Sequence, residues 1–162
     1  MPLPVPTADF TGKTVIVTGA NTGLGLEAAR HFTRLGAAKV ILGCRSTEKA
    51  EIAKSNIEST TKTAGVVEVW PIDLASFESV KQFCKRAGTL ERLDIVVANA
   101  AALSYGEFRT DEGYDTLVTV NVISNYLMVL LLLPKLRQTA AQFNVQPNLS
   151  IVSSVAHIVV RI

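Results

Sequence analysis

The segment Thr18–Gly25, TGANTGLG, places three glycines between an apolar run and a helical pattern. Gly19 permits a tight exit from a strand, and Gly23 and Gly25 remove side chains where a pyrophosphate would approach the backbone and a helix must pack on the sheet. Free N–H groups at the start of that helix attract phosphate oxygens. Glycines in such a turn can also serve only a positive φ, but the strand before it and the helix after it favour a dinucleotide site. The predicted contacts are Gly19, Asn21, Thr22, Gly23, Leu24 and Gly25.

A second group with chemical consequences stands about twenty positions beyond the glycines, where a dinucleotide site meets the adenosine ribose. Counting from Gly25 leads to Gly43, Cys44 and Arg45, and no acidic residue comes before Glu48. A carboxylate at this place accepts the 2′-hydroxyl of NAD, whereas an arginine pairs with the 2′-phosphate of NADP. The sequence therefore predicts NADP(H), with Arg45 as its phosphate contact. The alternative is that Arg45 is a solvated surface cation, and Cys44 is interpreted as filling the strand.

Alternating strands and helices must position these groups. Runs rich in β-branched residues predict five strands, at residues 13–19, 39–44, 66–74, 93–99 and 149–154. Pro71, near the end of the third run, indicates a sheet edge. Such strands predict an α/β fold with a doubly wound, parallel, Rossmann-like sheet that stops after its fifth strand. We find no internal linker or repeat, and predict one dinucleotide-binding domain over residues 1–162, incomplete at its C-terminus.

Local signals define the helices between these strands. Gly36 is suited to follow the first helix, Ser46 to cap a helix through Ile57, and Ser76 to cap the next one. A long helix is expected from about Asp111 to Leu133. Residues 148–162 are interpreted as one buried strand, and a parallel strand of this kind is normally followed by a covering helix and a further strand.

The T-G-x-x-x-G-x-G spacing of the first turn resembles that of the short-chain dehydrogenase/reductase family, with a likeness to its retinol-dehydrogenase-like and fungal reductase branches. The further matches, in the family's order, are the adenine-binding pair Asp73 and Leu74, ANAA at residues 98–101 in the place of N-N-A-G, the active-site Asn121 and the catalytic Ser154. The resemblance covers about residues 10–156. Ala98 and Ala101 depart from the family's pattern, in the loop that the resemblance places beside the nicotinamide.

The resemblance implies an NADP(H)-dependent oxidoreductase that reduces carbonyls or oxidises alcohols by hydride transfer. It adds these residues to the site: Asp73, Leu74, Asn99, Ala100 and Ala101 as cofactor contacts, and Asn121 and Ser154 as catalytic residues. Each polar group also has a structural alternative. Asp73 can cap the helix near Ser76, Asn99 and Asn121 can be satisfied buried amides, and Ser154 can be a strand-end hydroxyl.

Catalysis in the family also uses a tyrosine, and a lysine four residues further on, after the fifth strand; neither residue type follows Ser154. Tyr105 and Arg109 have a similar spacing but follow the fourth strand, so we interpret that spacing as coincidence. Three hypotheses stay open. The chain is the N-terminal part of an NADP-dependent oxidoreductase, a natural short homologue that acts as a non-redox catalyst such as an isomerase or cyclase, or a nucleotide-binding regulatory partner.

Composition argues against several other classes of protein. With 48% hydrophobic and 19% charged residues the chain is globular, and a net charge of +2 is too mild for nucleic-acid binding. The apolar window at residues 126–136 is shorter than a membrane span. Two histidines argue against a metal site, and His157 is expected in a loop. The N-terminal residues lack a signal-peptide pattern, so a cytoplasmic location is expected. The apolar helix and the open sheet edge predict a homo-oligomer.

Overall fold

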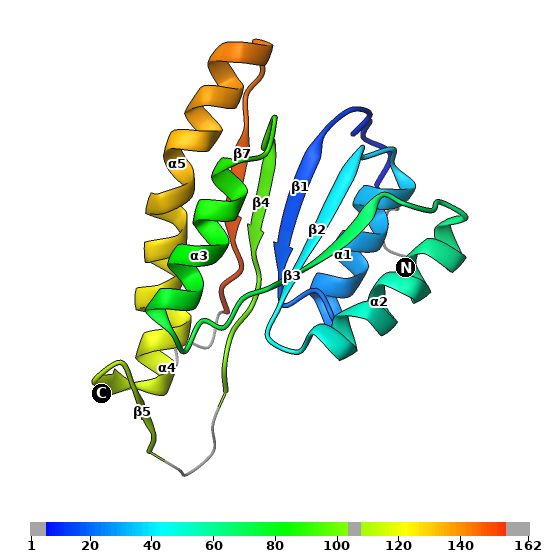
Figure 1. Cartoon of the computed structure of the whole chain (residues 1–162). Coiled ribbons are helices and arrows are strands. Elements are labelled where there is room, and N and C mark those ends of the chain that lie inside the picture. Colours follow the sequence, from blue (N-terminus) through cyan, green and yellow to red (C-terminus); the bar gives the residue numbers. More distant parts are fainter. Residues whose placement is uncertain (1–5, 104–107, 155–162) are drawn as a thin grey trace.

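The structure, a computed structural model, describes residues 6–103 and 108–154 and contains a five-stranded parallel sheet with the strand order β3-β2-β1-β4-β7 (Figure 1). Helices α1 and α2 cover one face of the sheet, and α3 and α5 cover the other. The predicted doubly wound, parallel α/β fold is therefore confirmed, and β3, which carries Pro71, lies at the sheet edge as predicted. The elements are β1 Thr14–Thr18, α1 Gly23–Arg34, β2 Lys39–Cys44, α2 Thr47–Thr61, β3 Val67–Pro71, α3 Phe77–Gly88, β4 Ile95–Ala98, β5 Thr110–Asp111, β6 Tyr114–Asp115, α4 Thr116–Val118, the π-helical turn η1 Thr119–Ile123, α5 Ser124–Phe143 and β7 Asn148–Ile151.

The central strand β1 is buried along its whole length and separates two apolar cores. Val15 and Val17 pack into the core that α1 and α2 cover, whereas Ile16 packs into the core that α3 and α5 cover. A strand buried on both faces has an apolar run in place of alternation, which is why the Val- and Ile-rich segments predicted it correctly. Because all five strands are parallel, the segments that follow their carboxyl ends meet at one edge of the sheet.

The local helix signals are also confirmed. The hydroxyls of Ser46 and Ser76 each accept a backbone N–H bond at 3.3 Å and immediately precede α2 and α3. Gly36 has a φ of +90° just beyond α1, a conformation that suits glycine. These caps fix where the two helices begin, and so where the loops from β2 and β3 end.

The predicted helix from Asp111 to Leu133 begins and ends elsewhere. Asp111 lies in an antiparallel hairpin formed by β5 and β6, whose turn residues Glu112 and Gly113 have φ values of +55° and +82°. Two consecutive positive φ values are typical of a tight hairpin turn and exclude a helix. The helical segment starts after the hairpin with α4 and η1, and α5 continues to Phe143.

Strand β7 is shorter and more exposed than predicted. The interpretation of residues 148–162 as one buried strand is wrong for the described part, because β7 ends at Ile151 and only Leu149 within it is part-buried. It pairs with β4 on one side, and no other strand among the described residues pairs with its second side. Ile151 and Val152 are consequently 41% and 46% exposed. Residues 155–162 lie outside the described part of the chain.

The apolar helix after the hairpin is longer than the sequence window suggested. By length and composition alone, the segment 116–143 could cross a membrane, and 33% of its most apolar stretch is buried within the protein. Its buried residues Met128, Leu132 and Leu136 belong to the core shared with α3. Core helices of soluble proteins meet the same length and composition test, so this observation does not assign a membrane span.

Candidate functional site

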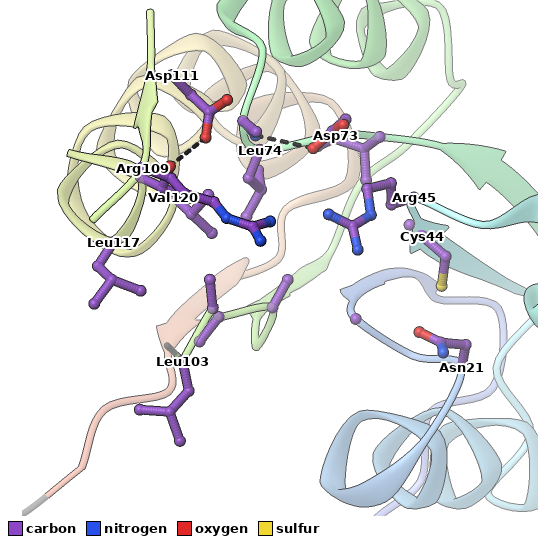
Figure 2. Close-up of a pocket in the computed structure, with 18 of the residues that line it drawn as sticks. Asn21, Cys44, Arg45, Asp73, Leu74, Leu103, Arg109, Asp111, Leu117 and Val120 are labelled. Carbon is purple, nitrogen blue, oxygen red and sulfur yellow. Dashed lines mark hydrogen bonds between the residues drawn. The ribbon is translucent and has the colours of Figure 1, made fainter. Parts of the chain in front are cut away.

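A groove of about 1270 Å³ opens beyond the carboxyl ends of β1 to β4 (Figure 2). It spans the place where the strand order reverses, between β1 and β4, which is where doubly wound sheets bind ligands. The predicted site residues that line the groove are Gly19, Asn21, Arg45, Asp73, Leu74, Ala100 and Ala101. The structure therefore brings together residues from four loops that are far apart in the sequence.

The glycine turn after β1 is fastened to the end of β4. The Asn99 side-chain amide donates to the Thr18 carbonyl at 3.0 Å, and the Thr18 hydroxyl accepts the backbone N–H groups of Asn99 and Ala100, both at 3.1 Å. Gly19 has a φ of +65°, and a Cβ there would lie 2.9 Å from the Cα of Ala100. Asn99 therefore holds the turn from beneath and does not line the groove, which supports the structural alternative for this residue.

The other two glycines of the motif serve different purposes. A Cβ on Gly25 would lie 2.5 Å from both the Asn99 amide nitrogen and the Gly19 carbonyl oxygen, so α1 can approach the turn only without a side chain here. Gly23 has a φ of +57° and open space where its Cβ would be. The backbone at Gly23 is therefore accessible to a ligand, whereas Gly25 is required by packing.

The start of α1 keeps its positive electrostatic field. Thr22 is the N-cap residue but makes no side-chain cap bond, and the first turn of the helix carries no acidic residue. Leu24 is 77% exposed. The free backbone N–H groups of this turn are thus not neutralised by a neighbouring carboxylate, and an anion placed there would be stabilised.

Arg45 follows β2 and its guanidinium points into the groove (Figure 2). Within the described ranges it makes no hydrogen bond or ion pair, so its charge is available to a ligand. The neighbouring Cys44 is buried, with the backbone N–H groups of Ala20 and Asn21 directed at its sulfur. Burial nevertheless raises the pKa of the Cys44 thiol above its ordinary value, which suits a strand filler and not a nucleophile.

Asp73 and Leu74 follow β3 and form another side of the groove. The Asp73 carboxylate accepts the Ala75 N–H at 2.9 Å, and its own backbone N–H donates to the Ser79 hydroxyl at 2.9 Å. Leu74 is only 5% exposed and belongs to the core. Asp73 therefore stabilises the turn into α3, as the structural alternative proposed, while it also borders the groove.

Asn121 does not line the groove and holds the loop after β4. Its side-chain oxygen accepts the Ala102 N–H at 2.8 Å, and its side-chain nitrogen donates to the Ala102 carbonyl at 2.9 Å. Both polar atoms of the side chain are therefore bonded to one backbone residue. Ala100 and Ala101, which precede this anchor, face the groove.

The predicted catalytic serine lies apart from these residues. Ser154 is exposed, comes after β7 and is not among the groove-lining residues. Tyr105 and His157 lie outside the described part of the chain. The structure thus places seven of the twelve predicted cofactor contacts on the groove, but Thr22, Gly23, Leu24, Gly25 and Asn99 are not among its lining residues, nor are Asn121 and Ser154.

One wall of the groove was missed by the sequence analysis. Residues 108–111, which lead into the β5–β6 hairpin, line it, and the Arg109 guanidinium points into the groove as Arg45 does (Figure 2). The Glu112 carboxylate accepts the Phe77 N–H at 2.8 Å and so ties the hairpin to the first turn of α3. The available signal was the glycine after Glu112, which the expectation of a helix from residue 111 concealed.

The arrangement suits an extended anionic ligand. Two guanidinium groups point into the groove, and the accessible turn at Gly23 leads to the free N–H groups of α1. In the described ranges, no three His, Cys, Asp or Glu side chains come together in a way that could hold a metal ion. Phosphate recognition through arginines and backbone N–H groups is therefore the chemistry that these residues offer.

Comparison with known proteins identifies the family to which this chain is similar. A family model described as short chain dehydrogenase matches residues 13–156. The short chain dehydrogenase/reductase dmxR8 of Cryptosporiopsis sp. (strain 8999) is 49% identical over 157 residues, which are 96% of this chain and 48% of that protein. The short chain dehydrogenase atnD of Emericella nidulans is 46% identical, over 96% of this chain and 50% of that protein. The chain therefore spans about half the length of the curated relatives that it matches.

Solved structures agree with this assignment. A metagenomic short-chain oxidoreductase in complex with NADP has a TM-score of 0.76 and 25% identity, and the match covers 91% of this chain and 65% of that one. A short chain dehydrogenase from Escherichia coli CFT073 complexed with NADPH has a TM-score of 0.73 and 29% identity, over 92% of this chain and 62% of that one. The glycine turn, the strand order and the matches together show that this chain belongs to the short-chain dehydrogenase family.

Proposed function

We propose that this chain binds NADP(H) and forms the nucleotide-binding part of an oxidoreductase that interconverts carbonyls and alcohols. The observation that carries the proposal is Arg45, whose guanidinium points into the groove at the end of β2 and has no partner among the described residues. The NADP and NADPH complexes of two proteins with the same fold support it. When bound, the nicotinamide would donate or accept the hydride.

Each side of the groove has its own task in this proposal. Arg45 pairs with the 2′-phosphate, and the N–H groups that follow Gly23 hold the pyrophosphate. Asp73 and Leu74 border the adenine, and the loop at Ala100 borders the nicotinamide end. These residues bind and orient the cofactor, and the adjacent apolar side chains exclude water from it.

The test of cofactor preference is the Arg45→Ala variant. A charge-assisted hydrogen bond contributes roughly 1.5–3 kcal/mol, so NADPH should bind about ten- to a hundredfold more weakly while the Kd of NADH hardly changes. Titration followed by nicotinamide fluorescence measures both constants. Arg137→Ala is the matched control, because Arg137 is exposed on α5 outside the groove. Equal losses of affinity for NADPH and NADH would show that Arg45 does not contact the 2′-phosphate.

One observation favours a second candidate, a nucleotide-binding regulatory partner. Both polar atoms of the Asn121 side chain are bonded to the backbone of Ala102 and are therefore not presented to a substrate. A chain that binds NADPH tightly and yields no product from carbonyl substrates would fit this candidate. Product analysis with and without NADPH separates it from an oxidoreductase and from a non-redox catalyst.

We also propose that the chain self-associates through α5. Tyr126 and Leu130 in α5 and Val122 in the preceding turn η1 are spaced by four residues and are 57%, 62% and 48% exposed, so they form an apolar stripe along this helical segment. Continuous exposed apolar surface of this kind is typical of an interface. Light scattering after size exclusion should show a dimer that Leu130→Glu converts to a monomer, whereas Gln142→Glu, an exposed change on the same helix, leaves it intact. A wild-type monomer at micromolar concentration would contradict the proposal.

A further inference from the structure

Two adjacent polar residues at the start of α5 are buried beside the groove and reach different loops. Ser124 is fully buried, and its hydroxyl donates to the Leu74 carbonyl at 2.6 Å. Asn125 is 4% exposed, and its side-chain nitrogen lies 3.4 Å from the Ala100 carbonyl oxygen. One helical turn thus contacts both the loop after β3 and the loop after β4.

The Asn125 amide also holds the π-helical turn that precedes it. Its side-chain nitrogen donates to the Val120 carbonyl at 2.9 Å and lies 3.4 Å from the Asn121 carbonyl. A π-helical turn shifts the backbone hydrogen bonds from their α-helical partners, so a side-chain donor at this place stabilises it. Because Asn121 in turn binds Ala102 through both side-chain atoms, Asn125 acts on the loop after β4 directly and through Asn121.

The side-chain oxygen of Asn125 shows that packing alone does not explain why an asparagine occupies this position. The Asn125 side-chain oxygen is buried and has no hydrogen-bond partner in the described part of the chain. An unpartnered buried acceptor destabilises a protein, and an apolar side chain of the same size would avoid that penalty. The amide therefore serves the structure through its donor side, which faces the carbonyls of Ala100, Val120 and Asn121.

We propose that Ser124 and Asn125 are positioning residues that set the separation of the two loops that border the groove. Ser124 fixes the loop after β3 at Leu74, and Asn125 fixes the loop after β4 at Ala100. The two residues are consecutive in the chain, so these contacts connect both loops to the same turn of α5. The consequence for cofactor affinity rests on the proposed function, but the positioning itself can be measured without a cofactor.

Amide hydrogen exchange of the cofactor-free 162-residue chain tests the positioning. In Asn125→Leu, the Ala102 N–H should exchange about five- to tenfold faster, because the loss of one typical hydrogen bond changes an opening equilibrium by that factor. In Ser124→Ala, the Ala75 N–H, which is bonded to Asp73, should show a similar rise. The smaller Asn125→Ser variant repeats the first measurement if the leucine prevents folding.

Thr139→Val is the matched control for both variants. The buried Thr139 hydroxyl on α5 accepts the Leu93 N–H at 2.9 Å. Leu93 precedes β4 and so lies at the amino end of that strand, whereas the groove lies beyond its carboxyl end. This change also removes a buried helix-to-backbone bond, but it should leave exchange at Ala75 and Ala102 unchanged. If the groove variants alter these two amides no more than the control does, Ser124 and Asn125 are ordinary core residues and the proposal is overturned.

Titration then links the positioning to the cofactor. Asn125→Leu should weaken NADPH about five- to tenfold and leave 2′,5′-ADP, which reaches only the adenine side, within twofold. Ser124→Ala should weaken both ligands. Equal losses for both ligands in every variant, the control included, would indicate general destabilisation and contradict the inference. If exchange responds as expected but the wild type binds neither ligand, the proposed function fails and the positioning role stands.

Discussion

Gly25 lies in the first turn of α1 with no room for a side chain, and replacing it gives a sharp test. In Gly25→Ala, the new Cβ would lie 2.5 Å from the Asn99 amide nitrogen and 2.5 Å from the Gly19 carbonyl oxygen. One of these atoms is backbone, so α1 must move away or Asn99 must leave Thr18. Overpacking contributes roughly 1–3 kcal/mol and a lost hydrogen bond about 1 kcal/mol more. The helical preference for alanine offsets about 0.5–1 kcal/mol.

The expected net loss of stability is about 1–3.5 kcal/mol, which lowers Tm by roughly 2–14 °C in a domain of this size. Thermal unfolding followed by circular dichroism measures it. Gly88→Ala is the matched control, because Gly88 ends α3 with no atom within 4 Å of its would-be Cβ. The control should have a Tm equal to that of the wild type or slightly higher. A Gly25→Ala protein as stable as the control would refute the conclusion that packing requires this glycine.

Two further predictions concern protonation and turnover. Burial raises the pKa of the Cys84 thiol from 9.0 to about 12. The neutral buried thiol therefore contributes fully to stability below pH 9, and this contribution is lost as the pH rises from 9 towards 12. The free energy of unfolding, measured by denaturant titration, should fall by up to about 4 kcal/mol over that range, and by less in Cys84→Ala. The 162-residue chain should oxidise NADPH with aldehydes, ketones or quinones only at the background rate, and Ser154→Ala should change nothing in an absorbance assay, because a positioned proton donor is worth ~10²–10⁴ in rate. Turnover that disappears with Ser154→Ala would reveal another donor.

The parts of the fold that depend on local chemistry were predictable from the sequence. The β-branched runs identified β1 to β4 because buried parallel strands need apolar residues on both faces. Ser46, Ser76 and Gly36 marked helix ends because each satisfies a local backbone requirement. The sequence also predicted the glycine turn, Arg45 and Asp73 as site residues. Each of them follows a strand, and spacing along the chain determines where strand ends lie in a parallel sheet.

The remaining features depend on neighbours that sequence periodicity does not include. The exposure of β7 follows from the absence of a second pairing strand among the described residues, and no residue of β7 itself indicates it. Ser124 and Asn125 were not predicted because polar residues in a helical pattern are expected on its surface, whereas here carbonyls from two loops surround them. Pro134 did not end α5, because the carbonyl that loses its helical bond belongs to the exposed Leu130, where water can replace it.

The separation of the two apolar cores by the sheet affects how the sequence can vary. The two cores share no buried side chain, since β1 sends Val15 and Val17 to one and Ile16 to the other. Substitutions in separate clusters combine nearly additively, so mutations tolerated in one core place little restriction on the other. The face that carries α3 and α5, next to the hairpin wall of the groove, can therefore diverge while the face that carries α1 preserves the glycine turn. A change of ligand at the hairpin wall does not require a change in how the phosphates are held.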